Sequence, residues 1–368
     1  ATMKEPWDGP ASILFSDGDI MGAVLVRNGL RPSRYYITTD DYLILSSEVG
    51  VLEIEPERIK VKERLRPGKM LLVDTVKGEV IDDNELKDSY ANMQPYGEWL
   101  DRNLVELKDL KIPNERVIEH RGEDLNRLQK AFGYTYESTK DTILPMARNG
   151  AESIAAMGID SPIPVLSKDQ QPLFNYFKQL FAQVTNPPID CIREEVVTST
   201  TTYIGKDGNL LEENAINCQV LKIHNPILTN TDLMKIRSMK REGFKVVTLP
   251  IVYYKNTSLQ TALDHLFVEA DRAHKDGANI LILSDRGVDE NHVAIPSLLA
   301  VAGLNQHLVE TKKRTSLAVI LESGEPREVH HFATLRGYGA CAINPYLVQD
   351  SIKNLIDEHM LDKDYYAA

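Results

Sequence analysis

One short stretch of the sequence contains the side chains that enzymes most often use for acid–base or metal chemistry. Glu328, His330 and His331 place a carboxylate beside two imidazoles, a set that could bind a metal ion or relay protons. Neighbouring residues on a helix point about 100° apart, so the two histidines do not face one site if the segment is helical. The sequence has no HExxH motif and no third ligand nearby. We therefore predict a structural or interface role for the pair, rather than a metal site.

Three other stretches could be read as functional. Ser284-Asp285-Arg286 follows an apolar run, at the position where the carboxyl end of a barrel strand would place catalytic residues. Residues 337–340, GYGA, precede an apolar run, whereas a dinucleotide loop follows a strand, so we interpret them as tight-turn glycines. Met157 has the flexible side chain of a core filler, and a place in the wall of a passage is the alternative.

Composition limits the classes of partner. The chain has 368 residues, 42% hydrophobic and 26% charged, and a net charge of −12 that argues against nucleic acid or an anionic membrane surface. The longest nearly apolar run, Ala294–Leu304, is too short to span a bilayer and contains Pro296. The three cysteines form no CxxC pair and no zinc spacing. With no secretory leader visible, we expect a cytoplasmic or organellar protein with reduced thiols.

The segment that most constrains the chain is the loop around Asn186-Pro187-Pro188. Two consecutive prolines remove two backbone donors and fix φ, so the loop is stiff and extended. Such a loop is either an ordinary connector or a means of holding groups in fixed positions. A helix is expected before it over Gln171–Phe181, and the charged string Arg193-Glu194-Glu195 follows it.

The first hundred residues have the pattern of an antiparallel sheet. Short apolar or alternating runs are separated by turn signals such as residues 16–19 and 66–68. No layer sufficient to cover the apolar face of this sheet is evident. We expect a β-rich unit over 1–103 and a helical connector over 104–134. The predicted strands are 12–15, 21–26, 35–38, 42–46, 51–54, 59–62, 70–74 and 80–81, and the predicted helices are 85–93, 98–107 and 123–132.

Residues 135–368 have an α/β pattern. A helix is expected over 139–157, and short apolar strands then alternate with helices, which predicts a parallel sheet with right-handed crossovers. A barrel and an open doubly wound sheet both fit. The predicted strands are 246–249, 280–284, 318–321 and 340–343, and the predicted helices are 259–276, 295–312, 328–336 and 347–358.

Several motifs, taken together and in order, resemble the large subunit of glutamate synthase. They are EPWDGPA and RNGLRPSRY near the start, then GAESIAAMGIDSPIPVLS, QVTNPPID, HNPILTN, ILILSDR, AIPSLLAVAGLNQHLVE and ESGEPREVHHFATLRGYGACAINPY. The resemblance implies a fragment: the C-terminal end of a class II glutamine amidotransferase domain over 1–103, and over 135–368 most of the central domain, truncated at its C-terminal end. The implied fold class is α/β, an incomplete β/α barrel preceded by a β-rich remnant of an N-terminal-nucleophile sandwich.

The first part of this resemblance carries no chemistry of its own. The family's amidotransferase nucleophile is an N-terminal cysteine, whereas this chain opens with Ala1 and has no cysteine before Cys191. Val26 stands where the family usually has an aspartate. By the same resemblance Cys191 and Cys341 replace other residues. We interpret Asn28, Gly29, Arg31 and Pro32 as structural loop residues, with φ above zero at Gly29.

The central part implies a role in guiding ammonia. In the family, ammonia released from glutamine passes through an internal tunnel to the FMN site, and no catalytic, cofactor or metal residue is implied in this segment. Asp285 and Arg286 are accordingly interpreted as an ion pair supporting loops. The resemblance places the tunnel wall at residues in two loops: Met157, Gly158, Val184, Thr185, Asn186 and Pro187.

The resemblance also implies the reaction and the partners. The parent enzyme converts glutamine, 2-oxoglutarate and two electrons into two glutamates, with FMN and an iron–sulfur cluster bound after residue 368. The expected partners are the remaining amidotransferase and FMN domains, with a small subunit or ferredoxin as electron donor. The isolated chain is expected to be inactive. A free-standing binding or scaffold module, and an independent barrel enzyme acting on a phosphorylated substrate, are the alternatives; no phosphate loop favours the latter.

Overall fold

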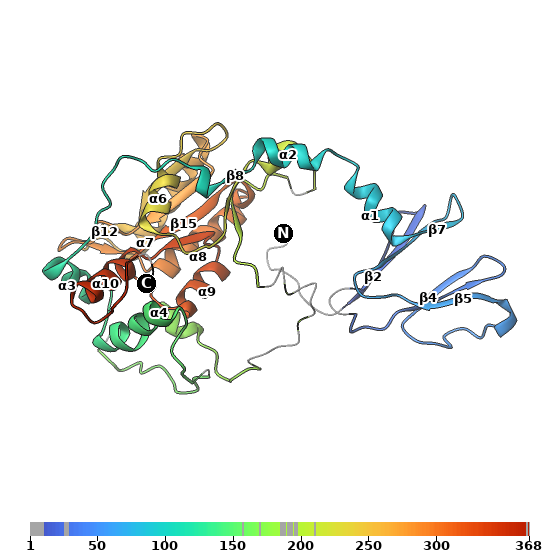
Figure 1. The fold of residues 1–368 in the computed structure, drawn as a ribbon, viewed down its shortest axis with the longest axis horizontal. Coiled ribbons are helices and arrows are strands. Elements are labelled where there is room, and N and C mark those ends of the chain that lie inside the picture. The colour runs from blue at the N-terminus through green and yellow to red at the C-terminus, as the bar shows by residue number, and fades with distance from the viewer. Residues whose placement is uncertain are drawn as a thin grey trace. The chain divides into compact units, whose positions relative to one another are not determined.

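The computed structural model divides the chain into two compact units (Figure 1). The first comprises Ala1–Glu98 and Pro188–Ser199, and the second comprises Trp99–Pro187 and Thr200–Ala368. The structure describes residues 11–25, 29–156, 158–168, 171–184, 198–209 and 211–365, with residues 189, 194 and 367. In this part of the chain, no helix is long and apolar enough to cross a membrane.

The first unit contains two antiparallel sheets that pack on each other. One sheet has the order β1-β2-β6-β7 and the other β4-β3-β5. Their shared core combines Ala23, Leu25 and Leu71 of the first sheet with Tyr35 and Leu45 of the second. The second sheet therefore supplies the covering layer that the sequence pattern did not reveal. The strands are β1 Ser12–Ser16, β2 Ile20–Leu25, β3 Arg34–Thr38, β4 Leu43–Ser46, β5 Ile59–Arg64, β6 Met70–Asp74 and β7 Glu79–Ile81.

Seven of the eight predicted strands are confirmed here, and the prediction of a strand over Val51–Ile54 is wrong. That segment forms bends and irregular backbone before a short 3₁₀ turn at Pro56–Arg58, and Pro56 at the start of the turn has no amide hydrogen to donate to a ladder. Three short helices follow in the predicted places: α1 Asp83–Ala91, α2 Tyr96–Asn103, which includes the boundary between the units, and α3 Gly122–Ala131 in the second unit.

A four-stranded parallel sheet of order β11-β13-β15-β16 forms the centre of the second unit. Its strands are β11 Val246–Pro250, β13 Ile280–Ser284, β15 Ala318–Glu322 and β16 Ala342–Asn344. All five residues of β13 and all five of β15 are buried, which is why both strands read as unbroken apolar runs. The predicted parallel sheet is confirmed.

Alternate residues of this sheet enter two different cores. Leu281, Leu283 and Val319 pack against helices on one face. Ile280, Ile282 and Ile320 pack on the other face against α6 and a second, smaller sheet. Figure 1 shows the helices gathered around β15. The helices of this part of the unit are α6 Asn230–Arg237, α7 Leu259–Lys275, α8 Ser297–Glu310, α9 Val329–Gly337 and α10 Tyr346–Asp357.

The smaller sheet was not predicted. Its order is β8-β10-β9, with β8 parallel and β9 antiparallel to β10. A two-stranded ribbon of β12 and β14 also lacks a clear sequence signal, since both strands have only three residues. The strands are β8 Val105–Glu106, β9 Thr202–Gly205, β10 Val220–Ile223, β12 Val252–Tyr254 and β14 His292–Ala294.

One predicted helix is confirmed only over its first part, and another is wrong. The helix expected over Thr139–Met157 consists of a π-helical turn at Ser138–Ile143 and α4 Leu144–Asn149, and Gly150 ends it with a φ of 66°. The helix expected over Gln171–Phe181 is only a 3₁₀ segment at Leu173–Phe177. Its apolar side chains are not buried together: Phe174 is fully buried, whereas Tyr176, Leu180 and Phe181 are exposed.

Candidate functional site

The carboxyl ends of the parallel strands carry a buried polar cluster. β13 ends at Ser284 and leads into Asp285 and Arg286, and β15 ends at Glu322 and leads into Ser323. Parallel strands present their carboxyl ends at one edge, so these residues meet there. This edge is where α/β folds usually bind ligands.

Glu322 is the centre of an ionic network. One carboxylate oxygen accepts hydrogen bonds from the Ser284 hydroxyl at 2.6 Å and from Nη2 of Arg237 at 2.5 Å. The other accepts from Nε of Arg286 at 2.6 Å. The predicted pairing of Arg286 with Asp285 is therefore wrong in its partner, because the guanidinium turns to Glu322 on the neighbouring strand. A carboxylate bound to two arginines and a hydroxyl fixes loops and is not free to act as a base.

Asp285 is buried in a separate group of hydrogen bonds. Its carboxylate accepts from the Ser323 hydroxyl at 2.5 Å, from the Gly324 amide at 3.1 Å and from the Tyr346 hydroxyl. Burial raises the pKa of Asp285 to about 7, against the opposing effect of these hydrogen bonds. Burial and the Asp285 carboxylate also raise the pKa of Tyr346. Since Asp285 is only 1% exposed, it cannot reach a bound substrate.

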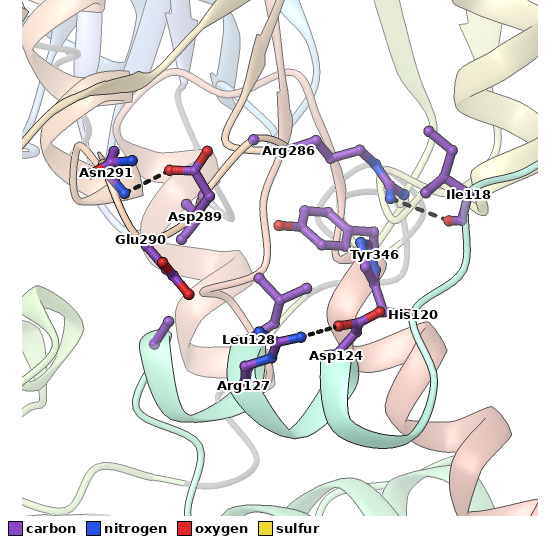
Figure 2. A pocket seen from close by; sticks show the side chains of 13 residues that line it. Ile118, His120, Asp124, Arg127, Leu128, Arg286, Asp289, Glu290, Asn291 and Tyr346 are labelled. Carbon is purple, nitrogen blue, oxygen red and sulfur yellow. Dashed lines mark hydrogen bonds and ion pairs between the residues drawn. The ribbon is translucent and has the colours of Figure 1, made fainter.

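A pocket of about 720 Å³ opens beside this cluster, between α3 and the loop after β13. Figure 2 shows the Tyr346 ring among the side chains that line it, and the Arg286 guanidinium lies 4.1 Å from the centre of that ring. The Arg286 guanidinium also donates to the Ile118 carbonyl at 3.3 Å. Leu128 of α3 adds apolar wall, and Arg127 is paired with Asp124 at 2.7 Å. The pocket is thus largely apolar, with its two arginines already engaged.

The histidine pair makes structural contacts in this fold. The Nε2 of His330 lies 2.9 Å from the carbonyl oxygen of Phe174, and the ring of His331 stacks on the Phe174 ring with centroids 4.3 Å apart. The segment is helical, and the two imidazoles contact different parts of Phe174, its carbonyl oxygen and its ring. Across the described ranges, no group of three or more histidine, cysteine, aspartate or glutamate side chains could hold a metal ion.

The structure places the Gly158 loop against the segment just before the second predicted wall loop. The amide of Ile159 donates to the carbonyl of Gln179 at 3.0 Å. A side-chain carbon on Gly158 would lie 2.8 Å from the Ala182 nitrogen and 3.0 Å from the Leu180 oxygen. Glycine is required here because two backbone segments touch. Val184 is exposed, and Met157, Thr185, Asn186 and Pro187 lie outside the described residues.

The predicted loop residues of the first unit are partly described. Gly29 has a φ of 67°, as predicted, and a side-chain carbon there would lie 2.6 Å from Cγ of Pro67. Arg31 and Pro32 are exposed. Asn28 lies outside the described residues, as do Val26 and Cys191. Gly339, at the predicted tight turn, has a φ of 114°.

Sequence reasoning missed the two positions that organise the buried cluster. Glu322 is the last residue of β15 and Tyr346 is the first residue of α10, and no motif distinguishes them. The available signal was positional: a charged residue ending a fully apolar strand, and a tyrosine two residues beyond another strand.

Comparisons with known proteins match the whole chain. Residues 127–368 match the family model described as the glutamate synthase central domain, and residues 1–99 match the class II glutamine amidotransferases. The NADPH glutamate synthase large chain of Bacillus subtilis is 47% identical over 368 residues, which is all of this chain and 24% of that protein. The NADH glutamate synthase of Schizosaccharomyces pombe is 41% identical over 98% of this chain and 18% of its own length.

A plant relative gives a similar match. The ferredoxin-dependent glutamate synthase 1 of Arabidopsis thaliana is 40% identical over 95% of this chain and 22% of its own length. The chain therefore spans about a quarter or less of the curated relatives that it matches.

Proposed function

Because the chain belongs to the glutamate synthase family, by its match to the central-domain model over residues 127–368, we propose that it functions as part of a glutamate synthase. The protein would convert glutamine, 2-oxoglutarate and two electrons into two glutamates. This segment connects the glutaminase and FMN parts and forms part of the wall of a passage for ammonia. By itself the segment would be inactive.

One observation carries the passage proposal. The backbone at Gly158 lies against the backbone of residues 180–182, the segment that leads directly into the second proposed wall loop at Val184. A wall of packed backbone is suited to neutral ammonia. Carbonyl oxygens accept weak hydrogen bonds from ammonia, whereas a carboxylate in the same place would stabilise ammonium and slow its transit.

The described residues do not fit the cofactors of the proposed enzyme. Cys218 and Cys341 are free thiols, and the described part of the chain offers no metal-binding group. The rim of the pocket carries Asp124, Asp289 and Glu290, which would repel the phosphate of FMN, while both of its arginines already have partners. We therefore assign FMN and the iron–sulfur cluster to other parts of the protein.

Further features of the proposal follow from the family. The domain division is 1–103, 104–134 and 135–368, with the parallel sheet of the last part forming an incomplete β/α barrel after a remnant of the amidotransferase sandwich. The remaining amidotransferase and FMN domains are the proposed partners, with a small subunit or ferredoxin as electron donor. The proposed location is the cytoplasm.

The test of the passage uses the full-length protein with bulky residues in the wall. Gly158→Val forces the two backbones apart, because even a first side-chain carbon would lie 2.8 Å from the Ala182 nitrogen. Thr185→Phe is the second wall variant, made separately. Each of the two variants should lower glutamate formation from glutamine, while glutamine hydrolysis continues and ammonia escapes into solution. Gly97→Ala is the matched control, since a side-chain carbon there would meet nothing within 4 Å.

The measurement is the ratio of glutamate made from 2-oxoglutarate to glutamine hydrolysed. A lower ratio in both wall variants, with an unchanged ratio in the control, is the expected result. Equal loss of synthesis and hydrolysis would contradict a passage here. An immunoblot of source cells that finds the chain only at its own size would favour a free-standing binding or scaffold module.

A further inference from the structure

The segment that precedes the proposed passage loop has little structure of its own. We call residues 171–184 the strap. Its one regular element is the 3₁₀ segment Leu173–Phe177, and the remainder is irregular. Phe174 is its single fully buried large side chain, whereas Leu180, Phe181 and Val184 are exposed. Only Leu173 and Phe174 of the strap pack into the apolar core, so the path of its remaining residues depends on further contacts with a neighbour.

Helix α9 supplies the first of these contacts. The Nε2–H of His330 donates to the carbonyl of Phe174 at 2.9 Å. The ring of His331 lies nearly parallel to the Phe174 ring, with 18° between the planes. One residue of the strap is thus held through both its backbone and its side chain by two successive residues of one helix.

The same helix holds the strap at two further points. The Glu328 carboxylate, just before α9, lies 3.2 Å from Nζ of Lys178 and 3.2 Å from Nε2 of His331. Just after α9, the Tyr338 ring meets the Phe177 ring edge to face, with centroids 5.3 Å apart. Residues at both ends of α9 therefore contact the strap, at Phe177 and Lys178.

His331 is neutral in this arrangement. Its Nδ1 accepts a hydrogen bond from the backbone amide of Arg327 at 3.2 Å, which leaves the proton on Nε2 facing Glu328. Burial lowers the pKa of His331, and the hydrogen bond from His331 lowers the pKa of Glu328 to about 2. The carboxylate consequently stays charged and keeps its pairing with Lys178.

These contacts connect α9 to the proposed passage. The strap continues from Lys178 directly to Gln179, which binds Ile159, and to residues 180–182, which touch Gly158. We propose that His330 and His331, with Glu328, are positioning residues that hold the strap against the Gly158 loop and so set the width of the ammonia passage. This inference rests on the proposed function and adds residues of helix α9 to it.

The test compares two substitutions of His330 in the full-length protein. His330→Ala removes the donor to the Phe174 carbonyl, whereas His330→Gln places an amide nitrogen at nearly the same reach and should restore it. His265→Ala is the matched control, because His265 is exposed on α7. Lys178→Met removes the ion pair between Lys178 and Glu328. It is a milder second variant, used if His330→Ala does not fold.

Two measurements are made on each variant. Hydrogen exchange of the amides of residues 173–182 should accelerate about tenfold in His330→Ala, in keeping with the loss of a partly buried hydrogen bond. The ratio of glutamate made to glutamine hydrolysed should fall in parallel. His330→Gln and His265→Ala should behave like the unmodified protein in both measurements.

The outcomes separate the inference from the proposed function. Unchanged exchange in His330→Ala and Lys178→Met overturns the positioning role. Faster exchange with an unchanged ratio also overturns it, provided that Gly158→Val lowers the ratio, and the passage then stands without α9. If Gly158→Val and Thr185→Phe leave the ratio unchanged as well, the proposed function itself fails.

Discussion

Asp285→Asn should remove a large pH dependence from the stability of the second unit. The Asp285 carboxyl is buried against Ser323, Gly324 and Tyr346, and its pKa is raised from 3.8 to about 7. Between these two pKa values the folded protein binds a proton that the unfolded chain has lost. Stability therefore falls as pH rises through that window, and it is level above about pH 7.

The size of the effect follows from the shift. A difference of about three pKa units corresponds to about 4 kcal/mol over the complete titration, at about 1.36 kcal/mol per unit. Between about pH 5 and pH 7.5, the linkage relation gives a loss of about 2.5 kcal/mol from this one group. Asparagine has nearly the same shape and no charge, so the variant should lack this part of the slope.

Urea unfolding followed by far-ultraviolet circular dichroism at several pH values measures the difference. The amide hydrogens that asparagine adds lower stability by a constant amount, which changes the offset between the two curves but not their slopes. Asp362→Asn, at an exposed position, controls for the charge change. Parallel curves for Asp285→Asn and the unmodified protein would refute the argument that Asp285 is held neutral by burial.

Two further substitutions test the packing and the capping that position the sheet. Ile282→Ala removes a fully buried side chain from the face of β13 that packs toward α6. It should lower the free energy of unfolding, measured with urea, by about 2–5 kcal/mol. A loss below about 1 kcal/mol would contradict tight packing of this face. Thr229→Ala removes the reciprocal cap that Thr229 forms with Asp232 at the start of α6, and should lower the free energy of unfolding by about 1 kcal/mol. Thr229→Ser keeps the hydroxyl and should lower it little. Equal losses in the two variants would argue against the cap.

The parallel sheet could be predicted from the sequence because burial on both faces leaves a direct signal. β13 and β15 are five-residue runs with every residue buried, and the amphipathic helix α7 lies between β11 and β13. The smaller sheet could not be predicted in this way. Its strand β8 has two residues and pairs with β10, more than a hundred positions away, so no local periodicity predicts this pairing.

The strap shows why one helix prediction failed. Residues 171–181 have apolar residues at helical spacing, but Pro172 and the contacts with α9 favour a 3₁₀ turn followed by extended backbone. Tertiary contacts here override a weak local preference.

The candidate site was predicted unevenly for a related reason. Asp285 and Arg286 could be placed at a strand end, but Glu322 ends the neighbouring strand β15 and Tyr346 begins α10. The sequence alone does not specify which elements lie next to β13.

Several contacts in the second unit join its early part to its late part. β8 pairs with β10, and the His120 imidazole lies 2.8 Å from the Asp350 carboxylate. Leu125 of α3 and Ile143 before α4 pack against α10. All of these contacts join residues before position 150 to residues after position 219. The chain between Gly150 and the strap is therefore not what holds these parts together, and an enzyme that cuts there would produce two polypeptides that remain one particle.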